Sequence, residues 1–512
     1  MTTATNPQEQ THRDLSALFV NVTATTEKLA RENKQLVEYI EQLRRGYFGR
    51  SSEKVDPDQL KLFADEAMDD APAAPTAPAA EKRAPAKGHG RKPFAAHLPR
   101  VTIVHDVADA DCHCDECKER LVAIGEDVCE RGHLVPAKVV VNRHVTKKYA
   151  CPNGHMVKSG VGAPAGVVEK AKFEASVYAH VAVAKYGDHL PLNRQETIFK
   201  RQGLELSKST MVDMIQLVHA KAAAPIVEVM RKEILAEPLI QADETPITVL
   251  LETEHGTKTG YVWVYRAKKK VVFVFRPSRE RDGPIRFLGD WKGTLQTDGY
   301  AGYDEVVRRN GLVRAGCWAH TRRKWKDAFD AGSADAARMI GLIQRLYRIE
   351  AALKTRGSMD ALSPAEFDSL RLKVRGRRSR PLVGRIAALV DEIGRKPSTT
   401  PQSLLGKAVG YTINQWPTLQ VFLADGAVEI DTNAVERAIR PIAVGRKNWL
   451  FAGSTRGADA AASLYSLINA CKALAINPEI YLADVLELAS PNADFNRLTP
   501  WAWAEARGMS IA

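Results

Sequence analysis

Residues 427–441 read AVEIDTNAVERAIRP, a short polar turn that leads into a helix with one acid, Glu436, among arginines. Two earlier stretches, 238–245 (PLIQADET) and 293–300 (GTLQTDGY), are apolar strand patterns that end in Asp243 and Asp298. Two strand-end aspartates and a helical glutamate can converge on a pair of divalent metals, which drive in-line displacement at phosphate. Two Mg²⁺ ions, or Mn²⁺ in their place, suit Asp243, Asp298 and Glu436, because Mg²⁺ prefers a few carboxylates together with substrate phosphates.

Neighbouring acids compete for each of these roles. Glu244 follows Asp243, and the alternation of side chains along a strand turns only one of the two toward a given face. Glu429 and Asp431 are alternatives to Glu436. Asp431 precedes the expected helix start, so it is better interpreted as a cap or turn residue.

The bulk composition favours a polyanionic partner. The chain has 512 residues, enough for several domains, and its 73 Lys and Arg against 61 Asp and Glu give a net charge of +12. A large basic protein most simply binds nucleic acid, here double-stranded DNA. We find no apolar run long enough to cross a membrane and no signal-peptide core, so we expect a cytoplasmic, nucleoid-associated protein without a membrane partner.

The N-terminal part predicts self-association. Over residues 13–46, apolar side chains recur every seven residues, at Leu15, Val22, Leu29, Leu36 and Leu43. Sustained heptads indicate a coiled coil and therefore a homo-oligomer, although an amphipathic helix docked on its own domain is the alternative. A connector with both basic and acidic residues follows at 47–70, and an Ala, Pro and Lys-rich linker at 71–99.

Five of the seven cysteines lie between Cys112 and Cys151, a crowding that favours metal over disulfides in a chain of this length. Cys114 and Cys117 form one Cys-x-x-Cys knuckle, and Cys151 with His155 forms a second pair. Four such ligands hold a structural Zn²⁺ tetrahedrally, so residues 108–160 are predicted to be a zinc-binding module. Cys112 is an alternative to His155 as the fourth ligand, and Cys129 is interpreted as a packed thiol.

Residues 165–235 are predicted to be helical. A helix over 191–201, a turn at Gly203 and a second helix capped by Ser207 have the shape of a helix-turn-helix, although helical hairpins of other function are equally common. Basic side chains favour the DNA-binding interpretation; they are Lys200, Arg201 and Lys208.

From residue 236 the pattern changes to strands, which are expected at 239–242, 245–252, 260–266, 271–276, 293–297 and 313–318. Successive strands followed by helices indicate a mixed sheet with helices on its faces. This catalytic domain is expected to span 236–470, with a basic helical insertion at 321–425, and a helical tail follows at 471–512.

Four motifs in order, DETP (243–246), QTDGY (296–300), CWAHTRRK (317–324) and NAVERAIRP (433–441), resemble the DDE transposases of the insertion-sequence-66 family. YFGRSSEK (47–54) and the cysteine knuckles resemble the family's N-terminal parts, so the likeness covers almost the whole chain. The resemblance implies an RNase H-like core, a zinc-binding module, Mg²⁺-dependent cutting and joining of DNA ends, and small accessory proteins from the same element. The second knuckle departs from the family, with Cys-x-x-x-His where Cys-x-x-Cys is usual.

The expected protein is therefore a multidomain α+β transposase. It has an RNase H-like α/β catalytic core with a helical insertion, preceded by a coiled-coil helix, a small zinc-binding module and a helical DNA-binding region. Asp243 and Asp298 would bridge the metals and Glu436 would be the third ligand. Basic residues after the last strand and on the final helix are expected to bind the scissile phosphate or line the DNA path; they are His320, Arg322, Arg323, Lys324, Arg437, Arg440, Arg446 and Lys447.

Two other functions fit parts of the sequence. One is a zinc-containing DNA-binding protein without catalysis, which would have no need of acids facing DNA. The other is a metal-dependent nuclease that cuts DNA without joining it, which residue types alone do not distinguish from a transposase.

Overall fold

The computed structural model describes residues 22–23, 25–26, 28–29, 32–33, 138–150, 157–159, 166–169, 171–251 and 256–509. The predicted connector, the linker and the four predicted zinc ligands lie outside these ranges. The eight described residues near the N-terminus are helical and exposed, in keeping with a helix there. Two compact units are formed, one by residues 1–68 and 144–512 and one by 69–143, and the fold described below is that of the first.

A five-stranded mixed sheet with strand order β5-β4-β3-β6-β7 forms the centre of the described fold. β3 (Leu239–Leu250), β4 (Thr257–Ala267) and β5 (Lys270–Arg276) are antiparallel neighbours, whereas β6 (Thr294–Gln296) and β7 (Val313–Ala315) extend the sheet in parallel. The mixed sheet predicted from the sequence is confirmed. The predicted break between 242 and 245 is wrong, because β3 pairs with β4 without interruption across Asp243 and Glu244.

The described helices follow in chain order. Before the sheet come α3 (Ala175–Tyr186), α4 (Leu192–Arg201), α5 (Lys208–Val218) and α6 (Ala224–Leu235). Between its strands lie α7 (Asp282–Leu288) and α8 (Asp304–Asn310). After the sheet come α9 (Trp318–Asp330), α10 (Ala334–Met359), α11 (Pro364–Val374), α12 (Arg380–Gly394), α13 (Leu404–Leu419), α14 (Asn433–Trp449), α15 (Thr455–Ala473), α16 (Pro478–Leu488) and α17 (Pro500–Glu505). None of the helices described is long and apolar enough to span a membrane.

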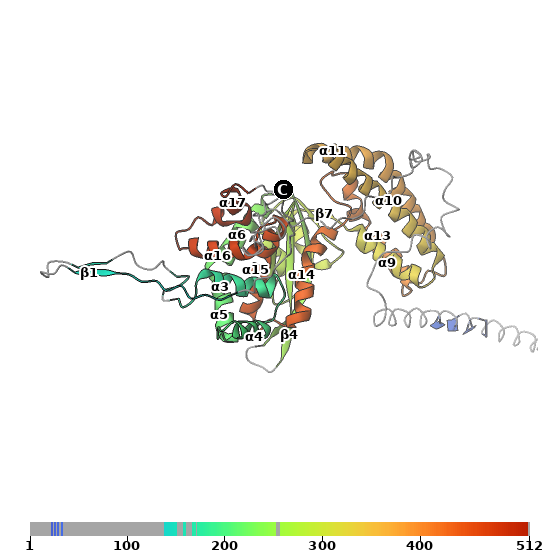
Figure 1. The fold of residues 1–512 in the computed structure, drawn as a ribbon. Helices are drawn as coiled ribbons and strands as arrows, with labels where there is room; N and C mark the ends of the chain where they lie inside the picture. The colour runs from blue at the N-terminus through green and yellow to red at the C-terminus, as the bar shows by residue number, and fades with distance from the viewer. Residues whose placement is uncertain are drawn as a thin grey trace, which may run out of the picture. The chain divides into compact units, whose positions relative to one another are not determined.

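Different helices pack against the two faces of the sheet. Tyr265 stacks on Phe287 of α7 on one face, with ring centroids 3.6 Å apart. On the other face, the backbone N–H of Phe273 donates to Ser466 of α15. Figure 1 shows the sheet at the centre, with α3, α6, α15 and α16 gathered on one side of it.

The helical region before the sheet has the shape that the sequence predicts. α4 ends at Arg201, Gly203 turns with a φ of +82°, and the Ser207 side chain accepts a hydrogen bond from Thr210 N at the start of α5. A positive φ is easily adopted only by glycine, which explains the turn at this position. α5 continues through a π-helical turn (His219–Ala223) into α6, and α3 packs against α15 and α16.

The predicted boundaries at 235/236 and 470/471 remain predictions. They cut through a region that forms one compact unit, since α6 and α15 pack against the sheet and α3 and α16 pack against α15.

The insertion is helical as predicted, although α9 already begins at Trp318. Its own apolar core includes Trp325, Ile343 and Ile386 and extends to Val428 and Ile430 in the chain that returns to the sheet. The long helices α9 and α10 pack side by side, and α13 packs against α9 (Figure 1).

Two arginines of the basic run 371–380 are buried rather than solvated. Arg375 is fully buried and donates two hydrogen bonds of 2.8 Å to the two oxygens of Glu350 on α10. It also donates to the backbone carbonyls of Phe422 and Asp425. Arg371 shares Glu350 at 3.3 Å. These arginines oppose the effect of burial strongly enough that the pKa of Glu350 is lowered.

Replacing Arg375 by Met is therefore expected to cost about 3–5 kcal/mol, because it removes one partner from a buried ion pair. We expect the melting temperature to fall by roughly 5–10 °C in a thermal denaturation experiment. Arg356→Met is the matched control, since Arg356 is 68% exposed and pairs with Asp360, the residue that follows the end of α10. Equal melting temperatures for the two variants would contradict a structural role for Arg375.

Candidate functional site

Asp243 and Asp298 lie at the same edge of two neighbouring parallel strands. β3 and β6 pair in register, with Gln241 opposite Gln296. Counting two residues on from this pair reaches Asp243 on β3 and Asp298 just after β6. The structure thus brings the first two predicted acids to adjacent positions.

The strand register separates Asp243 from Glu244. Asp243 pairs with Val264 and Glu244 with Trp263, so their side chains point to opposite faces of the sheet. Both carboxylate oxygens of Glu244 are occupied: Oε1 accepts from Arg279 at 2.6 Å and Oε2 from the Tyr303 hydroxyl at 2.9 Å. Asp243 accepts a hydrogen bond only from the neighbouring backbone N–H of Glu244, among the residues described. These contacts favour Asp243 as the ligand.

Glu436 lies in the first turn of α14, where the partial positive charge of a helix N-terminus favours an anion. Asp431 precedes that helix and accepts hydrogen bonds from the backbone N–H and the side-chain amide of Asn433. The prediction that Asp431 is a turn residue is confirmed.

α14 lies along β3. Near its C-terminus, Arg446 donates to the Thr245 hydroxyl at 2.8 Å and to the Pro246 carbonyl at 2.6 Å. Beyond the helix, Ala452 forms a bridge with Val249. Arg446, which the sequence suggested as a DNA contact, thus has a structural partner.

The three acids share one electrostatic environment. The pKa of Asp243 is raised to about 8, first by burial and then by the negative charge of Glu244, with further contributions from Asp298 and Glu436. Burial also raises the pKa of Glu244, although Arg279 and Tyr303 oppose this rise. Such mutual repulsion among buried carboxylates is what a bound cation would relieve.

The donor set suits a divalent metal, but the side chains do not converge on one point. Within the described ranges, no three His, Cys, Asp or Glu side chains are close enough together to hold a metal ion. Oε1 of Glu436 is buried and accepts no hydrogen bond from the residues described. A carboxylate oxygen that accepts no hydrogen bond can serve as one of the oxygen ligands that Mg²⁺ requires.

Two predicted phosphate-binding residues lie next to Glu436. His320 Nε2 is 3.7 Å and Arg323 Nη2 is 3.9 Å from its carboxylate oxygens. Both belong to α9, as do Arg322, which is half-buried, and Lys324, which is exposed. The structure thus places two basic side chains of α9, His320 and Arg323, close to Glu436.

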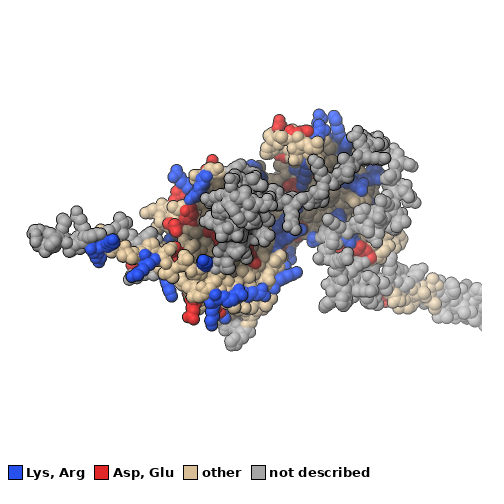
Figure 2. Space-filling model, viewed as in Figure 1, with Lys and Arg blue, Asp and Glu red and all other residues tan. Residues whose placement is uncertain are grey.

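Arg437, Arg440 and Lys447 are exposed on α14, at helical spacings of three and seven residues that place them on one side of the helix. Lys200, Arg201 and Lys208 are also exposed, on α4 and at the start of α5. In Figure 2, Lys and Arg atoms gather along the part of the surface where α4 and the adjoining end of α14 lie.

The predicted zinc ligands lie outside the described residues, but the strands that flank one pair are described. β1 (Lys148–Ala150) and β2 (Val157–Ser159) are antiparallel, with Ala150 opposite Val157. Cys151 and His155 stand between these two strands in the sequence.

The sequence analysis missed two groups of buried polar residues. Gln241 and Gln296 lie two residues before the aspartates, and Glu350, Arg371 and Arg375 form a cluster within the insertion. One signal was present: the same pattern precedes both aspartates, Gln-Ala-Asp at 241–243 and Gln-Thr-Asp at 296–298. A buried glutamine two residues before each acid predicts a shared polar contact. No local pattern separates the two buried arginines from the solvated ones in the same run.

Comparison with known families covers most of the chain. The family model described as "Transposase IS66 family" matches residues 170–460. The model described as "zinc-finger binding domain of transposase IS66" matches 111–153, which includes Cys112, Cys114, Cys117 and Cys151 but ends before His155. A leucine-zipper model of the family, described as "Transposase C of IS166 homeodomain", matches 35–103, including the stretch interpreted as a linker.

Three curated relatives from Sinorhizobium fredii are similar over most of their length. The uncharacterized protein y4jD is 31% identical over 497 residues, which is 91% of this chain and 93% of the relative. The uncharacterized protein y4qI is 32% identical over 82% of this chain and 78% of the relative, and y4hP is 29% identical over 92% and 89%. The transposase model matches more than half of the chain, and the leucine-zipper and zinc-finger models match the residues before it. The chain therefore belongs to the IS66 family of transposases.

Proposed function

We propose that this transposase cuts DNA at the ends of an insertion sequence and joins those ends to target DNA, using divalent metals held by Asp243, Asp298 and Glu436. The observation that carries the proposal is the position of the three acids. Asp243 and Asp298 each lie two residues beyond the paired Gln241 and Gln296, and Glu436 lies in the first turn of α14, the helix that lies along β3. An RNase H-like core is part of the proposal, supported by the mixed five-stranded sheet with helices on both faces.

Two Mg²⁺ ions, or Mn²⁺, would supply activation of the attacking oxygen and stabilisation of the leaving oxygen at phosphorus. Asp243 and Asp298 would hold these ions, and Glu436 would complete the ligand set with Oε1, which accepts no hydrogen bond from the described residues. Asp243 must be ionised to bind, which the raised pKa opposes until a cation is present.

In the cleavage step, a water oxygen forms a bond to phosphorus and the bond to the 3′-oxygen of the element end breaks, which leaves a 3′-hydroxyl. In the joining step, that hydroxyl attacks a target phosphodiester and displaces its 3′-oxygen. Neither step needs a covalent bond to the protein. His320 and Arg323, beside Glu436, are placed to bind the negatively charged phosphate during both steps.

The exposed basic residues supply surfaces for double-stranded DNA. Arg437, Arg440 and Lys447 extend from Glu436 along α14, and an α-helix rises about 1.5 Å per residue, so this row is roughly 15 Å long. The α4–α5 pair resembles a helix-turn-helix that could recognise the element ends. A coiled coil would bring two chains, and hence two DNA ends, together, with accessory proteins of the same element as further partners.

Asp298→Asn and Glu436→Gln are each expected to lower cleavage and joining by about a thousandfold or more, because each removes a metal ligand. The assay follows labelled element ends with Mg²⁺ and separates cleaved from joined products, with DNA binding measured in parallel. Asp282→Asn, at an exposed acid on α7, is the matched control and should keep activity.

The outcomes separate the possible functions. End binding without any cleavage by the unmodified protein, with each divalent metal and with accessory proteins added, would favour a non-catalytic DNA-binding protein. Cleavage without joining would favour a nuclease. Full activity of Glu436→Gln would move the third ligand to Glu429 or Asp431.

The raised pKa of Asp243 predicts that the free energy of unfolding depends on pH when a chelator keeps the protein free of metal. Its value in the folded protein, about 8, exceeds the usual value near 4, so the folded state holds the proton more tightly than the unfolded state. This contribution to stability is complete below pH ~4 and is lost as the pH rises toward 8. Relative to Asp243→Asn, which cannot ionise, the unmodified protein should melt progressively lower from pH 5 to pH 8, by several °C.

Adding Mn²⁺ at pH 8 should close this gap by stabilising only the unmodified protein. A gap that does not change with pH, or an equal effect of Mn²⁺ on both proteins, would contradict the predicted role of Asp243.

The zinc module predicts one Zn²⁺ per chain, measurable by elemental analysis of the purified protein. Cys114→Ser and His155→Ala should each lose the metal, while Cys129→Ser, the matched thiol control, should keep it. Full zinc content in His155→Ala together with its loss in Cys112→Ser would instead assign Cys112 as the fourth ligand.

A further inference from the structure

The two aspartates are each preceded by a buried glutamine. Gln241 on β3 and Gln296 on β6 are 2% and 0% exposed, and they face each other in register. Side chains two residues apart on a strand share a face, so Gln241 lies on the same face as Asp243. Buried amides are retained only where their hydrogen bonds are satisfied, so the partners of these two side chains indicate their role.

Gln296 connects β6 to the chain that carries Glu436. Its Nε2 donates to the Glu429 carbonyl at 2.6 Å and to the Gly316 carbonyl at 3.2 Å, and its Oε1 accepts from Gln241 Nε2 at 2.9 Å. The amide nitrogen of Gln296 thus donates two hydrogen bonds and its oxygen accepts one.

Gln241 makes the equivalent connection from β3. Its Oε1 accepts from Arg266 at 2.6 Å, which fixes the orientation of the amide. Its Nε2 then donates to Gln296 and, at 3.4 Å, to the Asp431 carbonyl. The two glutamines therefore tie both aspartate-bearing strands to residues 429–431, immediately before α14.

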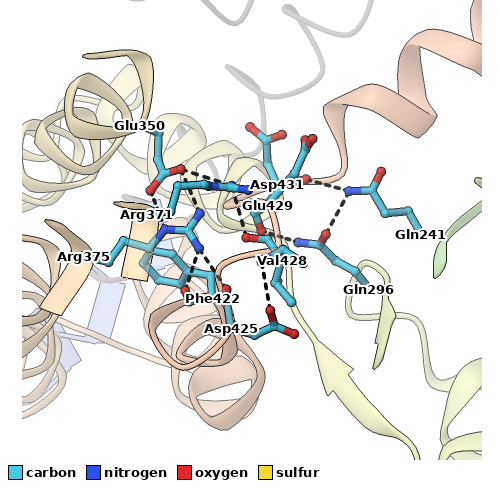
Figure 3. Close-up of polar contacts among 11 residues, drawn as sticks. Gln241, Gln296, Glu350, Arg371, Arg375, Phe422, Asp425, Val428, Glu429 and Asp431 are labelled. Atoms are coloured by element: carbon cyan, nitrogen blue, oxygen red, sulfur yellow. Dashed lines mark hydrogen bonds and ion pairs between the residues drawn. The ribbon is translucent and has the colours of Figure 1, made fainter. Parts of the chain in front are cut away.

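The return segment, residues 425–432, is held from its other side by the insertion. Arg371 donates to the Val428 carbonyl at 3.2 Å, and Arg375 donates to the Asp425 carbonyl at 3.0 Å. Figure 3 shows the two glutamines approaching this segment from one side and the Glu350–arginine cluster from the other.

Residues at the start of α9 form further hydrogen bonds with the return segment. The backbone N–H of Trp318 donates to the Ile430 carbonyl, and both the N–H and the hydroxyl of Thr432 donate to the buried Cys317 sulfur. The next residue begins α14, and Glu436 follows within its first turn. Because a helix is stiff, the position of its first residues sets the position of Glu436.

We propose that Gln241 and Gln296 are positioning residues that set Glu436 relative to Asp243 and Asp298, with the Glu350–Arg371–Arg375 cluster holding the return segment against them. The proposal rests on the proposed function of the three acids. A displacement of about 1 Å at a reacting centre can lower a rate by two orders of magnitude, so a lost amide contact would be visible in catalysis.

Gln296→Met removes the amide while nearly keeping the volume of the side chain. We expect turnover in end cleavage to fall by about 10-fold to 100-fold, with the KM for DNA ends changed less than about twofold. The half-saturating concentration of Mn²⁺, measured by calorimetry on the protein without DNA, should rise by at least about fivefold, since metal affinity depends on ligand geometry.

Asn310→Leu is the matched control. Asn310 is also buried, at 3% exposed, and donates to two backbone carbonyls, those of Gly289 and Trp291, but it lies at the end of α8. It should lower the melting temperature about as much as Gln296→Met does while leaving turnover and Mn²⁺ binding unchanged. If Gln296→Met fails to fold, Gln241→Met takes its place, because it leaves the bonds from Gln296 to Glu429 and Gly316 intact.

Turnover and Mn²⁺ binding in Gln296→Met equal to those in Asn310→Leu would overturn the proposal. Asp298→Asn, assayed in parallel, distinguishes this failure from that of the proposed function. If Asp298→Asn is inactive while Gln296→Met behaves as the control does, the acids are catalytic and the glutamines only structural. If Asp298→Asn keeps full activity, the proposed function itself fails.

Discussion

The structure depends most on the hydrogen bonds that fix the return segment between the sheet and the insertion. Backbone groups of residues 425–432 accept from or donate to side chains and backbone of β3, β6, α9, α11 and the π-helical turn that follows α11. Loops of this kind normally lie on the surface, because buried backbone must find hydrogen-bond partners. Here the partners come from parts of the chain that are far apart in sequence. The insertion of more than a hundred residues is thereby fixed to the sheet at the point where α14 begins.

This arrangement offsets a cost that the acids impose. Burial disfavours the charged form of Asp243, and the neighbouring acids repel it, so its pKa is raised first by burial and then by this repulsion. A site of this kind stays assembled only if other contacts hold its elements. The amides of Gln241 and Gln296 can do so without adding charge, whereas the buried arginines act farther from the acids. His320 and Arg323 then place positive charge beside Glu436.

Patterns local in sequence predicted much of the fold. The mixed sheet, the cap at Ser207, the turn at Gly203 and the turn role of Asp431 all follow from neighbouring residues. Contacts across long sequence separations were beyond such patterns. The bond between Gln296 and Glu429 spans 133 residues, and burial of Arg375 depends on a glutamate 25 residues earlier on another helix. The register of β3 with β4 likewise decides between Asp243 and Glu244, which composition could not do.

The central claim is that Asp243, Asp298 and Glu436 form one metal site on DNA. The most direct measurement is a crystal structure of the protein bound to an element end with Mn²⁺, in which anomalous scattering locates the ions. The account predicts manganese between the two aspartates, with a Glu436 oxygen in its coordination sphere and Glu244 still paired with Arg279. Manganese bound by Glu244, Glu429 or Asp431 instead, or its absence beside DNA seated at the three acids, would contradict the account.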